Sequence, residues 1–230
     1  MSKKKPELPE GWDVDTFVLA KNLAENSKVL FLYNEDFARI KKVAEMFKLD
    51  VTIMNDDPEI LEKANKIGFK IFLGNVNAGG LSEINEREYN YVVAENIIHS
   101  ARYPGDFLKD TTRICDNLVV CNENKAYWKK RLRFLFRGSL YVDNQYEIVP
   151  DDEYAWFNKY PWTLSHKDIV HLCSCQGMTI KKGTIIYKDG YIDNMYDIRS
   201  YPNMHAFKVY YLITDKSNKE YSYKLGGSIF

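Results

Sequence analysis

The chain has 230 residues, of which 45% are hydrophobic and 28% are charged. This composition is typical of a soluble globular protein and excludes a fibrous or mostly disordered one. The 32 basic and 32 acidic side chains cancel, which argues against nucleic acid as a partner. No run approaches the ~18 apolar residues of a membrane span, and the charged, proline-containing start lacks the apolar core of a signal peptide. We therefore expect a cytoplasmic protein with no membrane partner, whose residues 1–11 form a disordered arm.

The first half of the chain alternates between short apolar runs and segments of helical spacing. The apolar runs predict strands at residues 28–33, 50–54, 70–73, 89–94 and 118–121. Helical spacing and capping residues predict helices from Asp13 or Asp15 to about residue 26, at 37–47, at 58–67 after Asp56 or Asp57, and at 106–114. Residues 75–88 are expected to form a loop. This alternation is typical of a parallel sheet with helices on both faces.

The pattern changes after residue 121. A basic helix is predicted at 125–137 and a second helix at 165–175, followed by two long strands at 178–187 and 207–214 and a tail strand near 221–224. No internal repeat or linker interrupts the chain. We therefore expect a single domain over residues 12–230, with a helical and aromatic insertion at about 124–165.

The cysteines and histidines do not form a metal-binding pattern. His166, His171, Cys173 and Cys175 are close in sequence, but on one helix their side chains point in different directions and cannot converge on a tetrahedral ion. We expect buried cysteines, surface histidines and no metal. Cys121 ends a predicted strand at a place where active sites often lie, so a reactive thiol is an alternative to a small core residue there.

The basic helix at 125–137 has two interpretations. It can be a solvated face with Trp128, Leu132 and Leu135 packed inward, or a docking surface for an acidic partner, RNA or a membrane surface. The aromatic run from Tyr154 to Trp162 is too dense for an ordinary exposed loop. It either closes over the crevice at the strand ends or forms a protein interface.

A series of local motifs resembles the methionine biosynthesis protein MetW family, whose fold is that of class I S-adenosylmethionine-dependent methyltransferases. The resemblance covers residues 28–190 and is strongest over 89–173. It is carried by Tyr89-Asn90-Tyr91-Val92-Val93, Ala101-Arg102-Tyr103-Pro104, Phe107-Leu108, Arg113-Ile114, Leu118-Val119-Val120, Asn124, Trp128, Arg131-Leu132, Gly138, Tyr154, Trp156-Phe157-Asn158, Asp168 and Cys173. It implies an α/β, three-layer, Rossmann-like fold with a mostly parallel seven-stranded sheet and an antiparallel edge strand.

The sequence departs from the family in the loop that would hold the cofactor. The family's first strand ends in VLDLGCGDG, whereas this chain has none of the three glycines there and reads Tyr33-Asn34-Glu35 after the strand. Phe31 replaces the acid expected to hold the cofactor's amino group. The acid that pairs the ribose hydroxyls is matched by Asn55, next to Asp56, and the GDLD after the third strand is matched by Gly74-Asn75-Val76-Asn77. With Glu95, the residues Tyr33, Asn34, Glu35, Asn55, Asp56 and Asn75 are the candidate positions of a degenerate cofactor cleft.

The resemblance implies a function in methionine biosynthesis, where MetW-like proteins work beside homoserine O-acyltransferase. We expect a non-catalytic partner or regulatory subunit that binds this acyltransferase or an intact MetW-like subunit, without a cofactor, through Trp128, Arg131, Trp156 and Trp162. The alternative is an active methyltransferase in which Asn55, Asp56 and Asn75 still hold the nucleoside of S-adenosylmethionine. A nucleic-acid-binding module that uses the basic helix is disfavoured by the zero net charge.

Tyr33 is expected to block the cofactor cleft. It follows the first strand and replaces the first glycine of the family's loop, at the edge where ligands bind in open α/β sheets. We expect its side chain to project into the space of the cofactor and to stack on Phe37. Reversion to glycine alone is expected to destabilise the fold without restoring binding, because Phe31, Glu35 and Phe37 remain.

Overall fold

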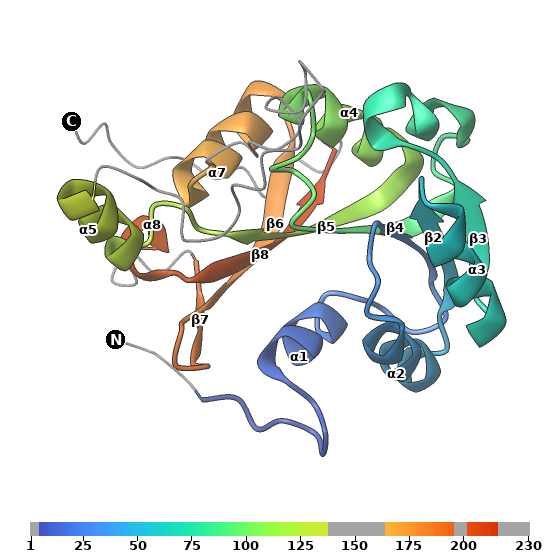
Figure 1. Cartoon of the computed structure of the whole chain (residues 1–230), viewed down its shortest axis with the longest axis horizontal. Helices are drawn as coiled ribbons and strands as arrows, with labels where there is room; N and C mark the ends of the chain where they lie inside the picture. Colours follow the sequence, from blue (N-terminus) through green and yellow to red (C-terminus); the bar gives the residue numbers. More distant parts are fainter. Residues whose placement is uncertain (1–4, 138–163, 196–201, 216–230) are drawn as a thin grey trace.

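The computed structural model describes residues 5–137, 164–195 and 202–215. Its centre is one sheet of eight strands in the order β3-β2-β1-β4-β5-β8-β6-β7 (Figure 1). The strands are β1 Lys28–Leu32, β2 Asp50–Asn55, β3 Lys70–Leu73, β4 Tyr89–Glu95, β5 Cys115–Glu123, β6 Thr179–Ile186, β7 Ile192–Asn194 and β8 Lys208–Thr214. Strands β1 to β5 are parallel, and β8 runs antiparallel to both β5 and β6.

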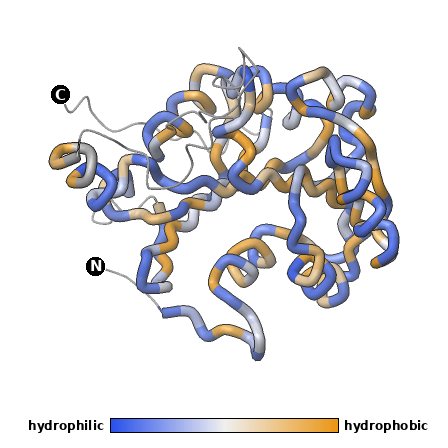
Figure 2. Tube along the Cα trace, viewed as in Figure 1, coloured by the Kyte–Doolittle hydropathy of each residue, from blue (hydrophilic) through white to orange (hydrophobic). Residues whose placement is uncertain are grey.

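Helices cover both faces of the sheet and complete three layers. The helices of four or more residues are α1 Val14–Ala20, α2 Phe37–Phe47, α3 Pro58–Ile67, α4 Pro104–Ile114, α5 Trp128–Arg137, α7 His166–Cys175 and α8 Pro202–His205. One core cluster packs α1, α2 and α3 against the sheet through Leu19, Ile40 and Leu61. The other packs α4 and α7 against the opposite face through Leu108 and Ile169. Figure 2 shows apolar residues along the central strands, between these two helical layers.

Local signals place most helix ends where the sequence predicts them. Asp13 caps α1, Asp57 caps α3 before Pro58, and Gly68 ends α3 with a φ of 100°. Ser165 and Asp168 form a reciprocal capping box at the start of α7, in which each side chain accepts from the other residue's backbone N–H.

The structure corrects several boundaries. The sheet has eight strands rather than seven, because Ile192–Asn194 adds the short β7 after a turn at Gly190 and pairs with β6. Helix α1 ends at Ala20 rather than near residue 26. The segment expected as a loop contains two short 3₁₀ helices, η1 Val76–Ala78 and η2 Gly80–Glu83. The predicted tail strand and most of the predicted insertion lie outside the described residues.

No helix in the described part of the chain is long and apolar enough to cross a membrane.

Candidate functional site

The candidate residues gather at the carboxyl ends of the parallel strands. Tyr33 and Asn34 follow β1, Asn55 ends β2, Asn75 follows β3 and Glu95 ends β4. Strand β1 lies between β2 and β4, so the chain changes direction across the sheet at this point, and such switch points are where open α/β sheets bind ligands. Six of the seven candidates are linked to one another or to neighbouring backbone, while Glu35 is exposed to solvent.

Tyr33 lies across the ends of β1, β2 and β3. Its backbone N–H donates to the Met54 carbonyl (2.8 Å), and its hydroxyl donates to the Gly74 carbonyl and accepts from the Val76 N–H, both at 3.3 Å. The ring packs against the core cluster of the α4 and α7 face. Burial raises the pKa of Tyr33 to about 12, although the Val76 hydrogen bond opposes this effect. The phenol therefore occupies this part of the crevice.

The backbone of Tyr33 has a conformation that is unusual for a bulky residue. Its φ is 49°, in the left-handed region that favours glycine and disfavours bulky side chains. The loop thus retains a glycine-like turn but carries a tyrosine. Phe37 does not stack on this ring as expected: it belongs to the core cluster of the opposite face, where its ring packs against Phe69 at a centroid distance of 6.4 Å.

Glu95 is the centre of a second arrangement, on the α1 and α2 side of the sheet. One carboxylate oxygen accepts from Arg39 (2.9 Å) and from the Tyr210 hydroxyl (2.7 Å), and the other accepts from Arg39 (2.9 Å) and Asn34 (2.7 Å). The side chains of Glu95 and Arg39 are only 10% and 14% exposed. Burial alone would lower the pKa of Arg39, but the charge and hydrogen bonds of Glu95 outweigh it and raise this pKa.

This network ties distant elements together. Asp15 of α1 accepts from Lys208 at 3.1 and 3.2 Å and lies 3.3 Å from the Tyr210 hydroxyl. The loop after β1, α2, β4, β8 and α1 are therefore joined through one partly buried cluster of polar groups. Both oxygens of Glu95 already accept two hydrogen bonds, so a ligand hydroxyl could bind this carboxylate only by displacing one of them.

The remaining cleft positions are also engaged within the chain. Asn55 is buried, and its side-chain oxygen accepts from the Asp57 N–H at the start of α3 (2.9 Å). Asp56 and Asn75 are partly accessible and bond each other across the ends of β2 and β3 (2.7 Å). With Tyr33 and Glu95, these contacts engage most of the candidate positions within the chain itself, while Asp56 stays exposed.

Asn124 and His166 are buried polar residues whose structural roles the sequence did not indicate. The side-chain nitrogen of Asn124 lies 3.1 Å from the carbonyls of Pro202, Asn203 and Ala206, and its oxygen accepts from the backbone of Ala126 and His166. Only the turn-forming chemistry of asparagine could have indicated this role. Asn124 thereby fixes α8 and the start of α7 to the end of β5.

His166 corrects the expectation of a surface histidine. It is buried, its ring stacks on Tyr211 at a centroid distance of 5.8 Å, and its Nδ1 lies 2.9 Å from the Tyr211 hydroxyl. Burial, with a contribution from the charge of Lys167, lowers the pKa of His166 to about 4. No sequence signal distinguishes this histidine from the exposed His171.

Burial makes three of the four cysteines unreactive. Cys115, Cys121 and Cys173 are buried, and burial raises the pKa of each, which keeps a thiol protonated and unreactive. Cys175 is exposed, against expectation, with its sulfur 3.5 Å from His171. Across residues 5–137, 164–195 and 202–215, no three His, Cys, Asp or Glu side chains form a group that could hold a metal ion.

Helix α5 shows an apolar stripe to solvent, which corrects the inward packing expected for Leu132 and Leu135. Leu135 is 73% exposed, Phe136 is 80% exposed, and Leu132 is also exposed. Trp128 is half-buried, edge-to-face with Tyr127, while Arg131 donates from Nε to the Ala126 carbonyl (2.6 Å). Trp156 and Trp162 lie outside the described residues.

Comparison with known proteins agrees with this architecture. The sequence matches the family described as "Methionine biosynthesis protein MetW" over residues 14–213. The chain belongs to the MetW family. No curated protein matches the chain.

Solved structures that resemble this MetW-family chain include several S-adenosylmethionine-dependent methyltransferases. One from Thermotoga maritima has a TM-score of 0.60 at 15% identity, over 89% of this chain and 90% of its own. A second, from Aquifex aeolicus, has a TM-score of 0.54 at 14% identity and covers 88% of this chain and 90% of its own. A third, from Methanosarcina mazei, has a TM-score of 0.57 at 12% identity and covers 86% of this chain and 96% of its own. At these identities the likeness shows the fold of a class I methyltransferase, and the activity has to be argued from the site.

Proposed function

We propose that this MetW-family chain is a non-catalytic cytoplasmic subunit that binds and regulates a homoserine O-acyltransferase or an intact MetW-like protein. The observation that carries the proposal is the side chain of Tyr33, which crosses the ends of β1, β2 and β3 and bonds the backbone of Gly74 and Val76. The saturated carboxylate of Glu95 adds to it. A protein that keeps the fold while its own side chains fill the ligand crevice is suited to binding a partner.

Helix α5 supplies the partner surface in this proposal. Leu132, Leu135 and Phe136 are spaced three and four residues apart, so they share one helix face. Lys129 and Arg131 are exposed beside this face. An apolar stripe with cationic neighbours fits an acidic partner surface that carries apolar anchors. Trp128 and Arg131 are the described residues of the predicted partner site, with Trp156 and Trp162 as its other members.

Two measurements test the proposal. Calorimetric titration with S-adenosylmethionine is expected to give no binding heat, whereas a micromolar Kd, or about −8 kcal/mol, would contradict the loss of the cofactor site. Co-purification with a homoserine O-acyltransferase or an intact MetW-like protein is expected, and a monomer that captures neither would contradict the partner function. Phe136→Asp is expected to abolish capture, while Met46→Asp, at an exposed methionine of α2, leaves it unchanged.

One observation favours an active methyltransferase as the second candidate. Asp56 and Asn75 meet at the ends of β2 and β3 and are not buried, so they could still contact a nucleoside if Tyr33 moved. This alternative predicts that Asp56→Ala and Asn75→Ala each weaken S-adenosylmethionine binding in the same titration. The comparison is meaningful only if the wild-type chain binds S-adenosylmethionine in this titration.

A further inference from the structure

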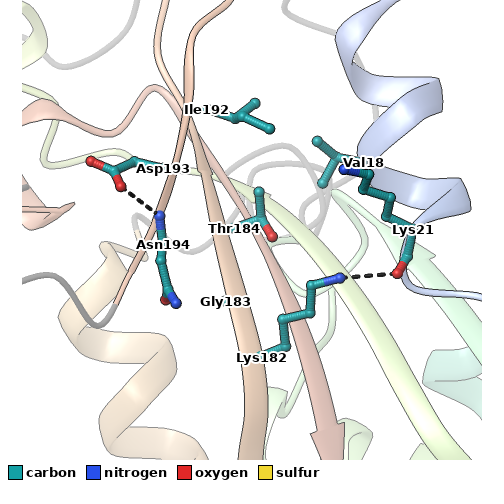
Figure 3. Close-up of a pocket in the computed structure, with 8 residues that line it drawn as sticks. All are labelled: Val18, Lys21, Lys182, Gly183, Thr184, Ile192, Asp193 and Asn194. Carbon is teal, nitrogen blue, oxygen red and sulfur yellow. Dashed lines mark hydrogen bonds between the residues drawn. The ribbon is translucent and has the colours of Figure 1, made fainter. Parts of the chain in front are cut away.

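A pocket of about 360 Å³ lies between α1 and the β6–β7 hairpin, away from the ends of β1 to β4 (Figure 3). The pocket is lined by Val18 of α1, Lys21 at the C-cap of α1, Lys182, Gly183 and Thr184 of β6, and Ile192, Asp193 and Asn194 of β7. This volume is within the range of sites for small molecules. None of these residues takes part in the crevice or in the surface of α5.

Two lysines line the pocket, and no carboxylate of the described residues pairs with either of them. Lys182 Nζ donates to the Lys21 carbonyl at 2.9 Å, and Lys21 Nζ lies 4.3 Å from the centroid of the Phe17 ring. Over residues 5–137, 164–195 and 202–215, neither lysine forms a salt bridge. Burial and the charge of Lys21 lower the pKa of Lys182, which is the effect expected of a half-buried cation that lacks a counter-charge.

Asp193 also lines the pocket, but it forms no ion pair with Lys21 or Lys182. The Asp193 carboxylate accepts from the Asn194 N–H (2.8 Å) and from the Tyr187 hydroxyl (3.4 Å). In Figure 3 it points to the far side of β7, away from Thr184 and the two lysines. The alternation of side chains along a strand explains this arrangement, since Ile192 faces α1 and Asp193 faces the other way.

We propose that this pocket binds a small organic anion. Its carboxylate or phosphate group is held by the ammonium groups of Lys182 and Lys21 and by the hydroxyl of Thr184, which lies two residues along β6 from Lys182 (Figure 3). Charge-assisted hydrogen bonds of this kind are about twice as strong as neutral ones. A short apolar body packs between Val18 and Ile192, whose side chains face each other across the opening. The bound anion supplies the missing counter-charge and links α1 to the edge of the sheet.

Titration followed by backbone amide NMR tests the proposal with the whole chain. The probes are sodium phosphate and sodium butyrate at constant ionic strength, with choline chloride as a cationic control. We expect saturable shifts at residues 182–184 and 192–194 with at least one anion and none with choline. The anion that saturates at the lower concentration identifies the headgroup as phosphate or carboxylate.

Variants separate a specific site from general attraction between charges. Lys182→Met is expected to weaken binding about tenfold or more, because one hydrogen bond to a charged group is lost, while Lys182→Arg retains binding. Lys63→Met removes the same charge from α3, beside the opposite edge of the sheet, and is expected to change nothing. Thr184→Val and Lys21→Met give the same test if Lys182→Met does not fold. Shifts that never saturate, or that persist equally in folded Lys182→Met and Lys63→Met, overturn the proposal.

Discussion

Replacing Tyr33 by alanine and by glycine separates two opposing contributions of this residue to stability. The half-buried ring contributes about 1 kcal/mol, or half of what full burial of a large side chain gives. Its φ of 49° costs a non-glycine residue about 1–2 kcal/mol. Glycine removes this strain but adds about 0.5–1 kcal/mol of chain entropy to the unfolded state. We therefore expect Tyr33→Gly to be only slightly less stable than wild type, and more stable than Tyr33→Ala by about 0.5–1 kcal/mol.

Urea denaturation followed by tryptophan fluorescence measures this difference. The matched control is Tyr91 of β4, which is also half-buried but has no positive φ; there the alanine variant is expected to be the more stable one. If Tyr33→Gly were less stable than Tyr33→Ala, strain at this turn would be refuted. Neither Tyr33 variant is expected to bind S-adenosylmethionine, because Glu95 and Asn55 remain engaged. Tight binding by Tyr33→Gly would mean that one side chain alone blocks the site.

Three other buried groups give separate predictions. Glu95→Ala leaves Arg39 buried without its counter-charge and is expected to cost about 3–5 kcal/mol in urea denaturation, most of which Arg39→Met in the same chain recovers; additive effects would contradict the coupling. His166 has a pKa of about 4 in the fold against 6.5 for the ordinary group, so the unfolded chain takes up the proton first. Stability is therefore expected to fall by up to about 3 kcal/mol as the pH drops from 6.5 to 4, and a His166→Phe variant with the same pH profile of Tm would refute this. Asn124→Ala leaves buried carbonyls without a donor and is expected to cost about 1–3 kcal/mol; unchanged hydrogen exchange in α7 and α8 would contradict its role.

The elements that the sequence predicts well are those fixed by nearby residues. Asp57, Pro58 and Gly68 mark both ends of α3 within a twelve-residue stretch, and the apolar runs of β1 and β4 are buried strands as expected. Strand β7 has three residues and a polar centre, so its pattern cannot be told from a turn. It becomes a strand because β6 offers it a hydrogen-bonding edge, which is tertiary information.

In the candidate site too, local sequence predicts some positions, while others depend on tertiary contacts. The position of Tyr33 follows from its place directly after β1, and the parallel strands bring Asn34 and Glu95 to one edge. The partners of Glu95 could not be predicted, because Arg39 is 56 residues away in sequence and Tyr210 is 115 residues away. The alternation of side chains along β8 would place Tyr210 on one face of the sheet. No local pattern predicts the strand order that pairs β8 with β5.

The position of β8 determines when the sheet can be completed during synthesis. Strands β1 to β5 occupy residues 28–123 and pair only with one another and with β8, so most of their partners are present as soon as they leave the ribosome. The β6–β7 hairpin is made next but reaches the sheet only through β8, and an isolated hairpin is only marginally stable in water. The hairpin can join the sheet only after residues 208–214 are made. The contact of Asp15 with Lys208 also needs β8, and it joins residues 193 positions apart in sequence. Contacts of such high sequence separation form late and slowly, so β8, the last strand of the described residues, completes both the sheet and its contact with α1.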